Sequence, residues 1–341
     1  MKKLAILGLG HIGKYVLDVL SNDTSIVANG FDLSNGYDLS NTDVLETIIK
    51  DANGVLASTP FFLNKKIAEV CNKYGVDYFD LTESVDVTNY VKTLNNARFV
   101  TQCGLAPGMV SIIANHLASS FKKVKDINIR VGALPKNSSN HIGYYRTWNT
   151  EGLINEYIRK CPAIINGNYV EVEPLTDTEN IILNGLHLEA ANTSGGLGSL
   201  AQTYINKADR VNYKTLRYPG HWKIMQFLKD DLNLSNNFDT FVKLFNENLP
   251  QTMEDYVYIL INVTGYDSND NLKIKQYSNV LENTTDMTAI QLTTGSGVMC
   301  VIDSWNKGHL NHLHGWVRQE ELDFQSIWNS QYNCYNKEII L

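Results

Sequence analysis

The sequence has few cysteines, and none of them form a close pair. They are Cys71, Cys103, Cys161, Cys300 and Cys334. Disulfide frameworks and zinc knuckles use closely spaced cysteines, so this spacing argues against both and favours a reducing, cytoplasmic environment. His309, His312 and His314 lie together in a polar loop, but no acidic or cysteine ligand is near them in the sequence. We therefore predict no metal site.

Stripes of positive charge and long apolar runs are also lacking. The net charge is −7, with Lys and Arg scattered along the chain, so nucleic acid is not an expected partner. No run reaches the roughly 18 apolar residues that a membrane span needs. Met1-Lys2-Lys3 leads into an apolar stretch that breaks at Gly8, and no cleavage site follows. We expect a cytoplasmic protein that does not bind membranes.

The length and the early pattern of the chain predict two domains, the first built on a parallel sheet. A chain of 341 residues exceeds what one compact core usually holds. Residues 3–102 alternate short β-like runs with amphipathic helical stretches, which is typical of a doubly wound parallel sheet. Strands are expected at 4–7, 26–31, 54–58, 78–81 and 98–101, and helices at 12–20, 42–50 and 63–74.

A glycine-rich loop joins the first predicted strand to the first predicted helix. Its sequence is Gly8-Leu9-Gly10-His11-Ile12-Gly13. The glycines allow a tight turn, close approach of a pyrophosphate to the backbone, and packing of the helix on the strand, while the helix amino terminus attracts negative charge. We predict that Gly8, Gly10, His11, Ile12 and Gly13 bind a dinucleotide.

Asp32 ends the second predicted strand, about 20 residues beyond the loop, where a carboxylate can accept hydrogen bonds from the adenosine ribose. The same carboxylate would repel a 2′-phosphate, and residues 33–39 contain no Arg or Lys to bind one. NAD is therefore favoured over NADP.

Two more loops follow predicted strands at the same edge of the sheet. Thr59-Pro60 follows strand 54–58, and Cys103-Gly104 opens the loop 103–108 after strand 98–101. Ligands bind at this edge in open α/β sheets, so both loops are expected beside the nicotinamide half of the cofactor, with an ordinary strand-exit turn as the open alternative for Thr59-Pro60. Cys103 has no activating His or Lys near it in the sequence, which favours a structural thiol over a nucleophile.

The fold class predicted is α/β, with a Rossmann-type doubly wound parallel sheet and a second, mixed α/β domain. From about Lys125 the strand-like runs become longer, at 126–134, 257–265 and 271–278. A helical run at 286–305 is expected to return the chain to the first domain. We assign 1–115 and 287–341 to the nucleotide-binding domain and 116–286 to the second domain.

The second domain contains the most unusual segment, Asn212-Tyr-Lys-Thr-Leu-Arg-Tyr-Pro-Gly-His221. It combines cationic, hydroxyl, phenol and imidazole groups with a Pro-Gly turn. The glycine-rich segment 194–198, by contrast, lacks the Lys-Ser or Lys-Thr of a phosphate loop, and we interpret it as a tight turn.

Taken together, these motifs resemble the saccharopine dehydrogenase family, above all its single-chain bacterial members and the lysine 6-dehydrogenases. The similarity extends over nearly the whole chain. The matching segments are 8–13, Tyr78-Phe-Asp-Leu-Thr-Glu83, 103–108, Val131-Gly-Ala-Leu-Pro135, Trp148-Asn-Thr-Glu-Gly-Leu153, 188–198, 215–221 and Val317-Arg-Gln-Glu-Glu321. The resemblance implies a second domain for substrate binding and dimerisation, a homodimer, and pyridine-nucleotide-linked oxidation of a C–N bond in a lysine-derived amino acid.

Three positions depart from the fungal saccharopine reductases that the chain resembles. Those proteins have Asp, Cys and Arg near the positions of Ala106, Gly132 and Glu151. Loss of an Asp and an Arg changes which charges a substrate can present, because an unpaired buried charge is costly. A carboxylate at Glu151 suits an amine better than a second carboxylate, which favours lysine over saccharopine.

The predicted chemistry needs a neutral amine, whose ammonium form titrates near ~10.4, and hence a base or a desolvating site. Glu83 and His221 are the candidate catalytic residues, as base or amine anchor, and Arg217 suits the substrate α-carboxylate. Arg217 as an interdomain ion pair, Glu83 as a helix-start acid and His221 as a turn residue remain open alternatives. Tyr145, Glu151 and Thr193 complete the predicted substrate contacts.

The first hypothesis is thus an NAD-dependent dehydrogenase similar to lysine 6-dehydrogenase, acting by hydride transfer and imine hydrolysis. A saccharopine or carboxynorspermidine dehydrogenase-type enzyme is the alternative within the same class. A catalytically silent NAD-binding regulator is the alternative of another class.

Overall fold

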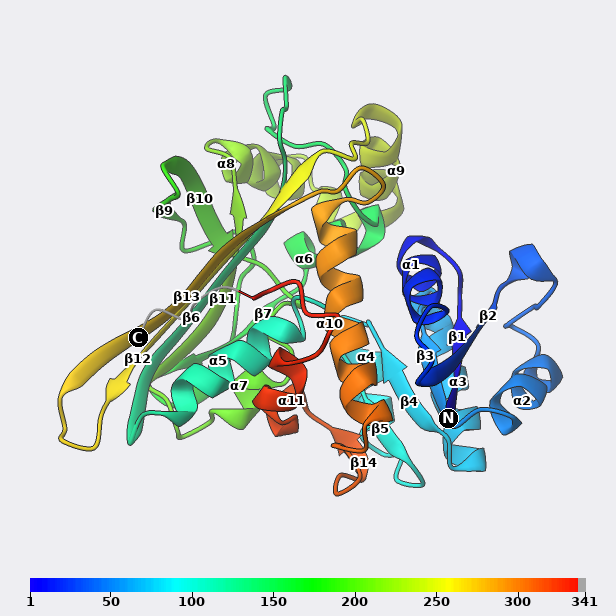
Figure 1. Ribbon diagram of the computed structural model, residues 1–341. Helices are drawn as coiled ribbons and strands as arrows, with labels where there is room; N and C mark the ends of the chain where they lie inside the picture. The colour runs from blue at the N-terminus through cyan, green and yellow to red at the C-terminus, as the bar shows by residue number, and fades with distance from the viewer. Residues whose placement is uncertain (337–341) are drawn as a thin grey trace. The chain divides into compact units, whose positions relative to one another are not determined.

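The computed structural model describes residues 1–336 (Figure 1). The chain forms two compact units, and each has its own sheet. Unit 1 comprises residues 1–112 and 294–334, and unit 2 comprises residues 113–293 and the segment that begins at Tyr335. The predicted domain bounds were 115/116 and 286/287, and the last five residues of the predicted return segment, 337–341, lie outside the described part.

Unit 1 has a six-stranded parallel sheet in the order β14-β5-β4-β3-β1-β2. The strands are β1 Lys2–Leu7, β2 Ile26–Phe31, β3 Gly54–Ala57, β4 Asp77–Asp80, β5 Arg98–Val100 and β14 Gly315–Val317. The first five agree with the sequence prediction to within a few residues. The predicted Rossmann-type parallel sheet is therefore confirmed.

Helices pack on both faces of this sheet. One face carries α2 Thr42–Lys50, α3 Phe61–Tyr74 and α4 Val85–Val91, whose apolar residues share a core with alternate residues of the strands. On the other face, Trp305 of α10 (Ala289–Asn306) packs edge-on against Phe79 and donates from its indole nitrogen to Asp77 at 2.7 Å. α1 His11–Leu20, α11 Phe324–Trp328 and the short helices η1 Leu33–Asn35 and η4 Gln319–Glu321 complete unit 1.

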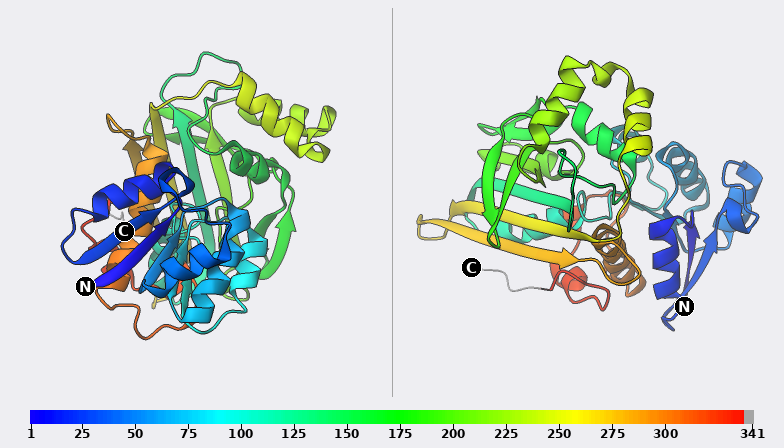
Figure 2. Two further views of the ribbon diagram at one scale, coloured as in Figure 1. Left: turned by 90° about the vertical axis from the view of Figure 1, so that its right-hand side faces the viewer. Right: turned by 90° about the horizontal axis from the view of Figure 1, so that it is seen from above.

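Unit 2 has an eight-stranded mixed sheet, as the sequence predicted for the second domain. Its main order is β13-β12-β6-β11-β10-β9, and the hairpin of β7 and β8 pairs with β11. The strands are β6 Lys123–Pro135, β7 Cys161–Ile165, β8 Asn168–Val172, β9 Glu179–Leu183, β10 Leu186–Asn192, β11 Arg210–Arg217, β12 Asp255–Tyr266 and β13 Leu272–Glu282. The long strands β12 and β13 run side by side in Figures 1 and 2.

Helices cover one end of the unit 2 sheet and enclose an aromatic core. α6 Thr150–Ile158 and α9 Phe238–Asn248 contribute Tyr157, Phe241 and Phe245 to it, and α8 His221–Gln226 contributes Trp222. The remaining helices are α5 Met109–Ser119, α7 Leu200–Thr203, and the short η2 Phe227–Asp231 and η3 Leu234–Asn236. Within residues 1–336, no helix combines the length and apolarity that crossing a bilayer requires.

Candidate functional site

The glycine loop of unit 1 has the geometry of a diphosphate cradle. Gly8 has φ +89°, and a Cβ there would lie 2.5 Å from the carbonyl oxygen of Ser58. A Cβ on Gly13 would lie 1.9 Å from the carbonyl oxygen of Gly8, so only glycine lets α1 pack this closely on the loop. A Cβ on Gly10 would meet nothing within 4 Å, which leaves open space at the centre of the loop.

The amino terminus of α1 borders that space. Its N-cap is Gly10, no side chain caps it, and its first turn, from His11 through Ile12, carries no acidic residue. The free backbone N–H groups and the helix dipole favour an anion at this end of the helix. These residues fit the diphosphate of a dinucleotide.

Asp32 is fixed at the end of β2 by backbone donors. Its Oδ2 accepts from the N–H of Leu9 at 3.0 Å, and its Oδ1 accepts from the N–H of Ser34 at 2.9 Å. The hydrogen bonds from Ser34 and Leu9 hold the pKa of this carboxyl below its usual range, so the group is ionised at neutral pH. A fixed negative charge next to the glycine loop fits an adenosine ribose and disfavours a 2′-phosphate.

Two loops follow β3 and β5 at the same edge of the sheet. Thr59 donates from its hydroxyl to Asn64 at 2.9 Å, and Pro60 directly precedes α3. In the second loop, Gly104 bridges to Gly108, where a Cβ would lie 2.2 Å from the carbonyl oxygen of Gly104. Cys103 is buried, and burial raises its pKa strongly, in agreement with a structural thiol.

Asp80 links the loops that follow β4 and β5, and its role was missed in the sequence. It is fully buried at the end of β4, where its carboxylate accepts from the hydroxyl of Tyr78 at 2.9 Å and from the N–H groups of Thr82 at 3.1 Å and Gln102 at 2.8 Å. Burial raises its pKa to about 7. Glu83, a predicted catalytic residue, lies in the same loop and is partly buried. A charged residue within the apolar run Tyr78-Phe-Asp-Leu81 was the available signal.

In unit 2, Arg217 and His221 come together in one buried aromatic cluster. Arg217 is 1% exposed at the end of β11. Its Nε donates to the hydroxyl of Tyr157 at 3.0 Å, its Nη1 donates to the carbonyl of Leu216 at 3.0 Å, and its guanidinium lies 5.0 Å from the ring centre of Tyr144. Among residues 1–336 no carboxylate lies within ion-pair distance of Arg217.

His221 is fully buried, and both of its ring nitrogens have partners. Nε2 lies 3.1 Å from the hydroxyl of Tyr157, and Nδ1 lies 2.9 Å from the carbonyl of Ile142. The carbonyl requires Nδ1 to donate, so Nε2 accepts from Tyr157. Burial and the charge of Arg217 lower the pKa of His221 to about 3. This satisfied, neutral imidazole favours the structural alternative over the role of substrate base.

Glu156 belongs to the same cluster and was missed in the sequence. It lies on α6 and is 7% exposed, yet its carboxylate makes no hydrogen bond with any described residue. Burial raises its pKa to about 7, and the positive charge of Arg217 acts in the opposite direction. Its neighbours in sequence, Asn155 and Tyr157, gave no indication of this burial. A buried, unbonded carboxyl group with such a pKa is a candidate proton carrier.

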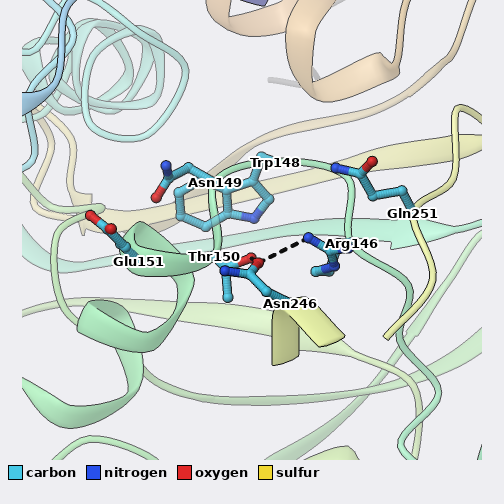
Figure 3. Close-up of a pocket in the computed structure, with 7 residues that line it drawn as sticks. All are labelled: Arg146, Trp148, Asn149, Thr150, Glu151, Asn246 and Gln251. Atoms are coloured by element: carbon cyan, nitrogen blue, oxygen red, sulfur yellow. Dashed lines mark hydrogen bonds between the residues drawn. The ribbon is translucent and has the colours of Figure 1, made fainter. Parts of the chain in front are cut away.

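An open cavity of about 230 Å³ lies at the amino terminus of α6 (Figure 3). Its lining residues are Arg146, Trp148, Asn149, Thr150, Glu151, Asn246 and Gln251. Asn246 holds the wall together, since its side-chain oxygen accepts from Arg146 at 2.9 Å and from Thr150 at 2.7 Å. Glu151 lies in the first turn of the helix, is exposed, and is one of the residues that line the cavity.

The remaining predicted substrate contacts lie elsewhere in unit 2. The hydroxyl of Tyr145 accepts from the N–H of Ser139 at 3.1 Å, and Tyr145 does not line the cavity. Thr193 is buried, and its hydroxyl pairs with that of Thr215 at 2.6 Å. The structure thus brings Arg217 and His221 together and places Glu151 at a cavity, but it leaves Tyr145 and Thr193 in local contacts. Among the residues described, no group of three or more His, Cys, Asp or Glu side chains is arranged to hold a metal ion.

Comparison with known proteins gives a consistent family. Residues 104–338 match the saccharopine dehydrogenase C-terminal domain. A curated relative, the mitochondrial alpha-aminoadipic semialdehyde synthase of Mus musculus, is 22% identical over 325 residues, which cover 85% of this chain and 34% of the relative. The chain therefore spans about a third of the length of that relative.

Two solved structures share the fold. Saccharopine dehydrogenase (L-Glu forming) from Saccharomyces cerevisiae matches with a TM-score of 0.74 and 14% identity, covering 96% of both chains. Homospermidine synthase from Legionella pneumophila, solved in complex with NAD, matches with a TM-score of 0.65 and 13% identity, covering 99% of this chain and 90% of that one. Since the C-terminal domain match covers most of the chain, the protein belongs to the saccharopine dehydrogenase family, as the sequence motifs predicted.

Proposed function

We propose that this protein is an NAD-dependent oxidoreductase that oxidises a C–N bond of a lysine-type amino acid, as lysine 6-dehydrogenases do. The observation that carries the proposal is the cradle of Gly8, Gly10 and Gly13 beside the uncapped start of α1, with ionised Asp32 at its side. The family relationship supports the same class, since its named members include a saccharopine dehydrogenase.

The cofactor is proposed to be NAD rather than NADP. Gly8 to Gly13 would hold the diphosphate, Asp32 the adenosine ribose, and the loops at Thr59-Pro60 and Cys103-Gly104 the nicotinamide side. Bound NAD supplies the hydride acceptor. The NAD complex of the homospermidine synthase, which shares the fold, is in keeping with this assignment.

The substrate side is proposed to combine charges of both signs. Glu151 offers an exposed carboxylate to an amine at the cavity. That cavity has a volume of about 230 Å³ and is open to solvent. Arg217 forms no ion pair with a described carboxylate, although Glu156 acts on its charge from within the same cluster, so it remains the proposed partner of the α-carboxylate.

A base is needed because the amine must lose its proton before hydride leaves the carbon. Glu156, whose pKa burial raises to about 7, suits this task better than His221, because both ring nitrogens of His221 are already engaged with Tyr157 and Ile142. Glu83 remains a second candidate, in the loop after β4.

Measurement of NADH formation with lysine, ornithine, saccharopine and carboxynorspermidine tests the proposal. Lysine should give the highest kcat/KM, and Glu151→Gln should raise the KM for lysine about tenfold, the magnitude of one charge-assisted contact. Glu171→Gln, on the exposed strand β8, is the matched control and should change nothing.

Other outcomes point to the alternatives. Faster turnover of saccharopine or carboxynorspermidine than of lysine would assign the protein to the secondary-amine enzymes. Tight NAD binding without turnover of any of the four would leave a silent NAD-binding regulator. We also propose a homodimer, which light scattering of the purified protein would test.

A further inference from the structure

Asp80 is a buried carboxylate without a neutralising cation. All three of its hydrogen-bond donors are uncharged: the hydroxyl of Tyr78 and the backbone N–H groups of Thr82 and Gln102. In the part of the chain that the structure describes, no Lys, Arg or His forms an ion pair with it or acts on its pKa. Ionised carboxylates are seldom buried in this way, because removal from water costs several kcal/mol unless a positive charge compensates.

The titratable groups that face Asp80 do not supply that charge. Tyr78 extends from the same strand, and Cys103 lies in the loop after β5. Burial raises the pKa of both groups well above neutrality, so both are uncharged at pH 7. Cys71 of α3 interacts electrostatically with Tyr78, and burial raises the pKa of its thiol, so it is neutral as well. The negative charge of Asp80 therefore remains uncompensated within unit 1.

The position of Asp80 in the sheet suggests where the missing positive charge comes from. In unit 1 the strand order places β4 two strands from β1, on the side away from β2 and Asp32. Adjacent strands are about 4.8 Å apart, so the end of β4 is roughly 10 Å from the glycine loop that follows β1. With the adenosine ribose at Asp32 and the diphosphate at α1, the nicotinamide half extends toward the ends of β3, β4 and β5.

We propose that Asp80 is the counter-charge of the oxidised nicotinamide ring and makes the site prefer NAD⁺ over NADH. The inference rests on the proposed function, because it assumes that unit 1 binds the dinucleotide as described. The nicotinamide ring of NAD⁺ carries a positive charge, which hydride transfer removes. A fixed negative charge near the bound ring would stabilise the first state and not the second.

The hydrogen bonds of Asp80 also position the backbone around that ring. Its Oδ1 holds the N–H groups of Thr82 and Gln102, and the backbone carbonyl of Asp80 accepts from the N–H of Cys103 at 2.8 Å. Gln102 has φ +66°, a conformation that a residue with a side chain rarely adopts, and this hydrogen bond helps to hold it there. Asp80 is thus a positioning residue, and its charge and its geometry can be separated experimentally.

Asp80→Asn separates them. Asparagine has the same shape, its oxygen can accept from Thr82 and Gln102, and its amide can donate to the oxygen of Tyr78, so the loops keep their bonds. Tyr78→Phe is the matched control, compared with the wild type at about pH 8.5, because it removes one hydrogen bond that lowers the pKa of Asp80 while the carboxyl group is still ionised at that pH. The Kd values of NAD⁺ and NADH are measured by calorimetry and fluorescence without any substrate, so the result does not depend on turnover.

We expect Asp80→Asn to weaken the binding of NAD⁺ about tenfold, which is the effect of losing one charge pair at the effective dielectric of a protein. The affinity for NADH should change little. Tyr78→Phe should leave the ratio of the two Kd values near that of the wild type. In the wild type, NAD⁺ affinity should fall as the pH drops below about 7 and Asp80 becomes protonated. Asp80→Asn should abolish that dependence.

Equal weakening of both cofactor forms by Asp80→Asn would overturn the proposal and leave only a structural role. An unchanged Kd for NAD⁺ would overturn it as well. A wild-type chain that binds neither form would refute the proposed function and this inference together. Normal binding with the predicted ratio, but no turnover of any amine, would refute the enzymatic proposal alone.

Discussion

Individual glycines of the cradle have separable roles. At Gly13 an added methyl group would lie 1.9 Å from the carbonyl oxygen of Gly8, whereas at Gly10 it would meet nothing within 4 Å. Gly13 therefore allows close packing of the helix on the loop. Gly10 leaves a space that a ligand can occupy.

We predict that Gly13→Ala destabilises unit 1 by about 2 kcal/mol, a typical cost of overpacking, and abolishes NAD binding. Gly10→Ala should leave the unfolding midpoint unchanged. It should still weaken NAD binding, because its methyl group enters the space proposed for the diphosphate. Denaturant unfolding and calorimetry distinguish these outcomes. Loss of stability in Gly10→Ala would contradict this division of roles.

Cofactor-binding residues near a glycine fingerprint can be recognised from the sequence, whereas the burial of a titratable side chain cannot. The loop 8–13 and Asp32 were predicted because their spacing is local, and the structure places them together. Glu156 and Asp80 were missed as site residues because their raised pKa values arise from burial, which elements distant in the sequence create and which the local sequence does not reveal. His221 stood out for its chemistry, yet its two hydrogen bonds are to Tyr157 and Ile142.

At the scale of elements, prediction succeeded where strands were buried and flanked by amphipathic helices. β2 and α2 were predicted with the bounds that the structure has, and β1, β3, β4 and β5 to within a few residues. The strands β7 to β11 and the three-residue β14 were not predicted. Most of them are short, their sequences give no clear alternation of apolar and polar residues, and pairing with strands distant in the sequence determines them.

Helix α10 depends on one carboxylate from another element. Asp255, at the start of β12, is fully buried and accepts from the N–H of Ala289 at 2.5 Å and of Ile290 at 3.2 Å. These N–H groups belong to the first turn of the helix and have no partner within it. The carboxylate thereby fixes where this long helix begins.

We predict that Asp255→Ala lowers the free energy of unfolding by about 2 kcal/mol, the typical effect of hydrogen bonds to a charged group. Asp255→Asn, whose side-chain oxygen can still accept from the helix, should lose less than half as much. Circular dichroism during urea denaturation measures both. Equal losses in the two variants would show that the charge, and not hydrogen bonding, stabilises the helix.

At the scale of the whole molecule, buried carboxyl groups determine how stability responds to pH. Burial raises the pKa of Asp80 and Glu156 to about 7 and that of Asp255 to about 6, all above the values near 4 of an unfolded chain. Between pH 4 and 7 the native state therefore binds protons that the unfolded state has released. His221, with its pKa lowered to about 3, acts in the opposite direction below about pH 6.5.

The three carboxyl groups with raised pKa values outweigh the one imidazole with a lowered pKa. We therefore predict that the free energy of unfolding falls as the pH rises from about 5 to 7 and then levels off. Urea unfolding at pH 5.5 and 7.5 checks this, and the double variant Asp80→Asn, Glu156→Gln should show a smaller difference. Stability that rises over this range would contradict the assigned pKa directions.

The last strand of the unit 1 sheet comes from the far end of the chain. β14, at Gly315–Val317, pairs in parallel with β5, at Arg98–Val100. During synthesis, roughly 200 residues separate the two strands, which is roughly 10–40 s of translation. For that period the growing chain carries β5 as an open strand edge, which can pair with other chains. The growing chain is therefore exposed to aggregation at this edge until β14 has emerged from the ribosome and paired with β5.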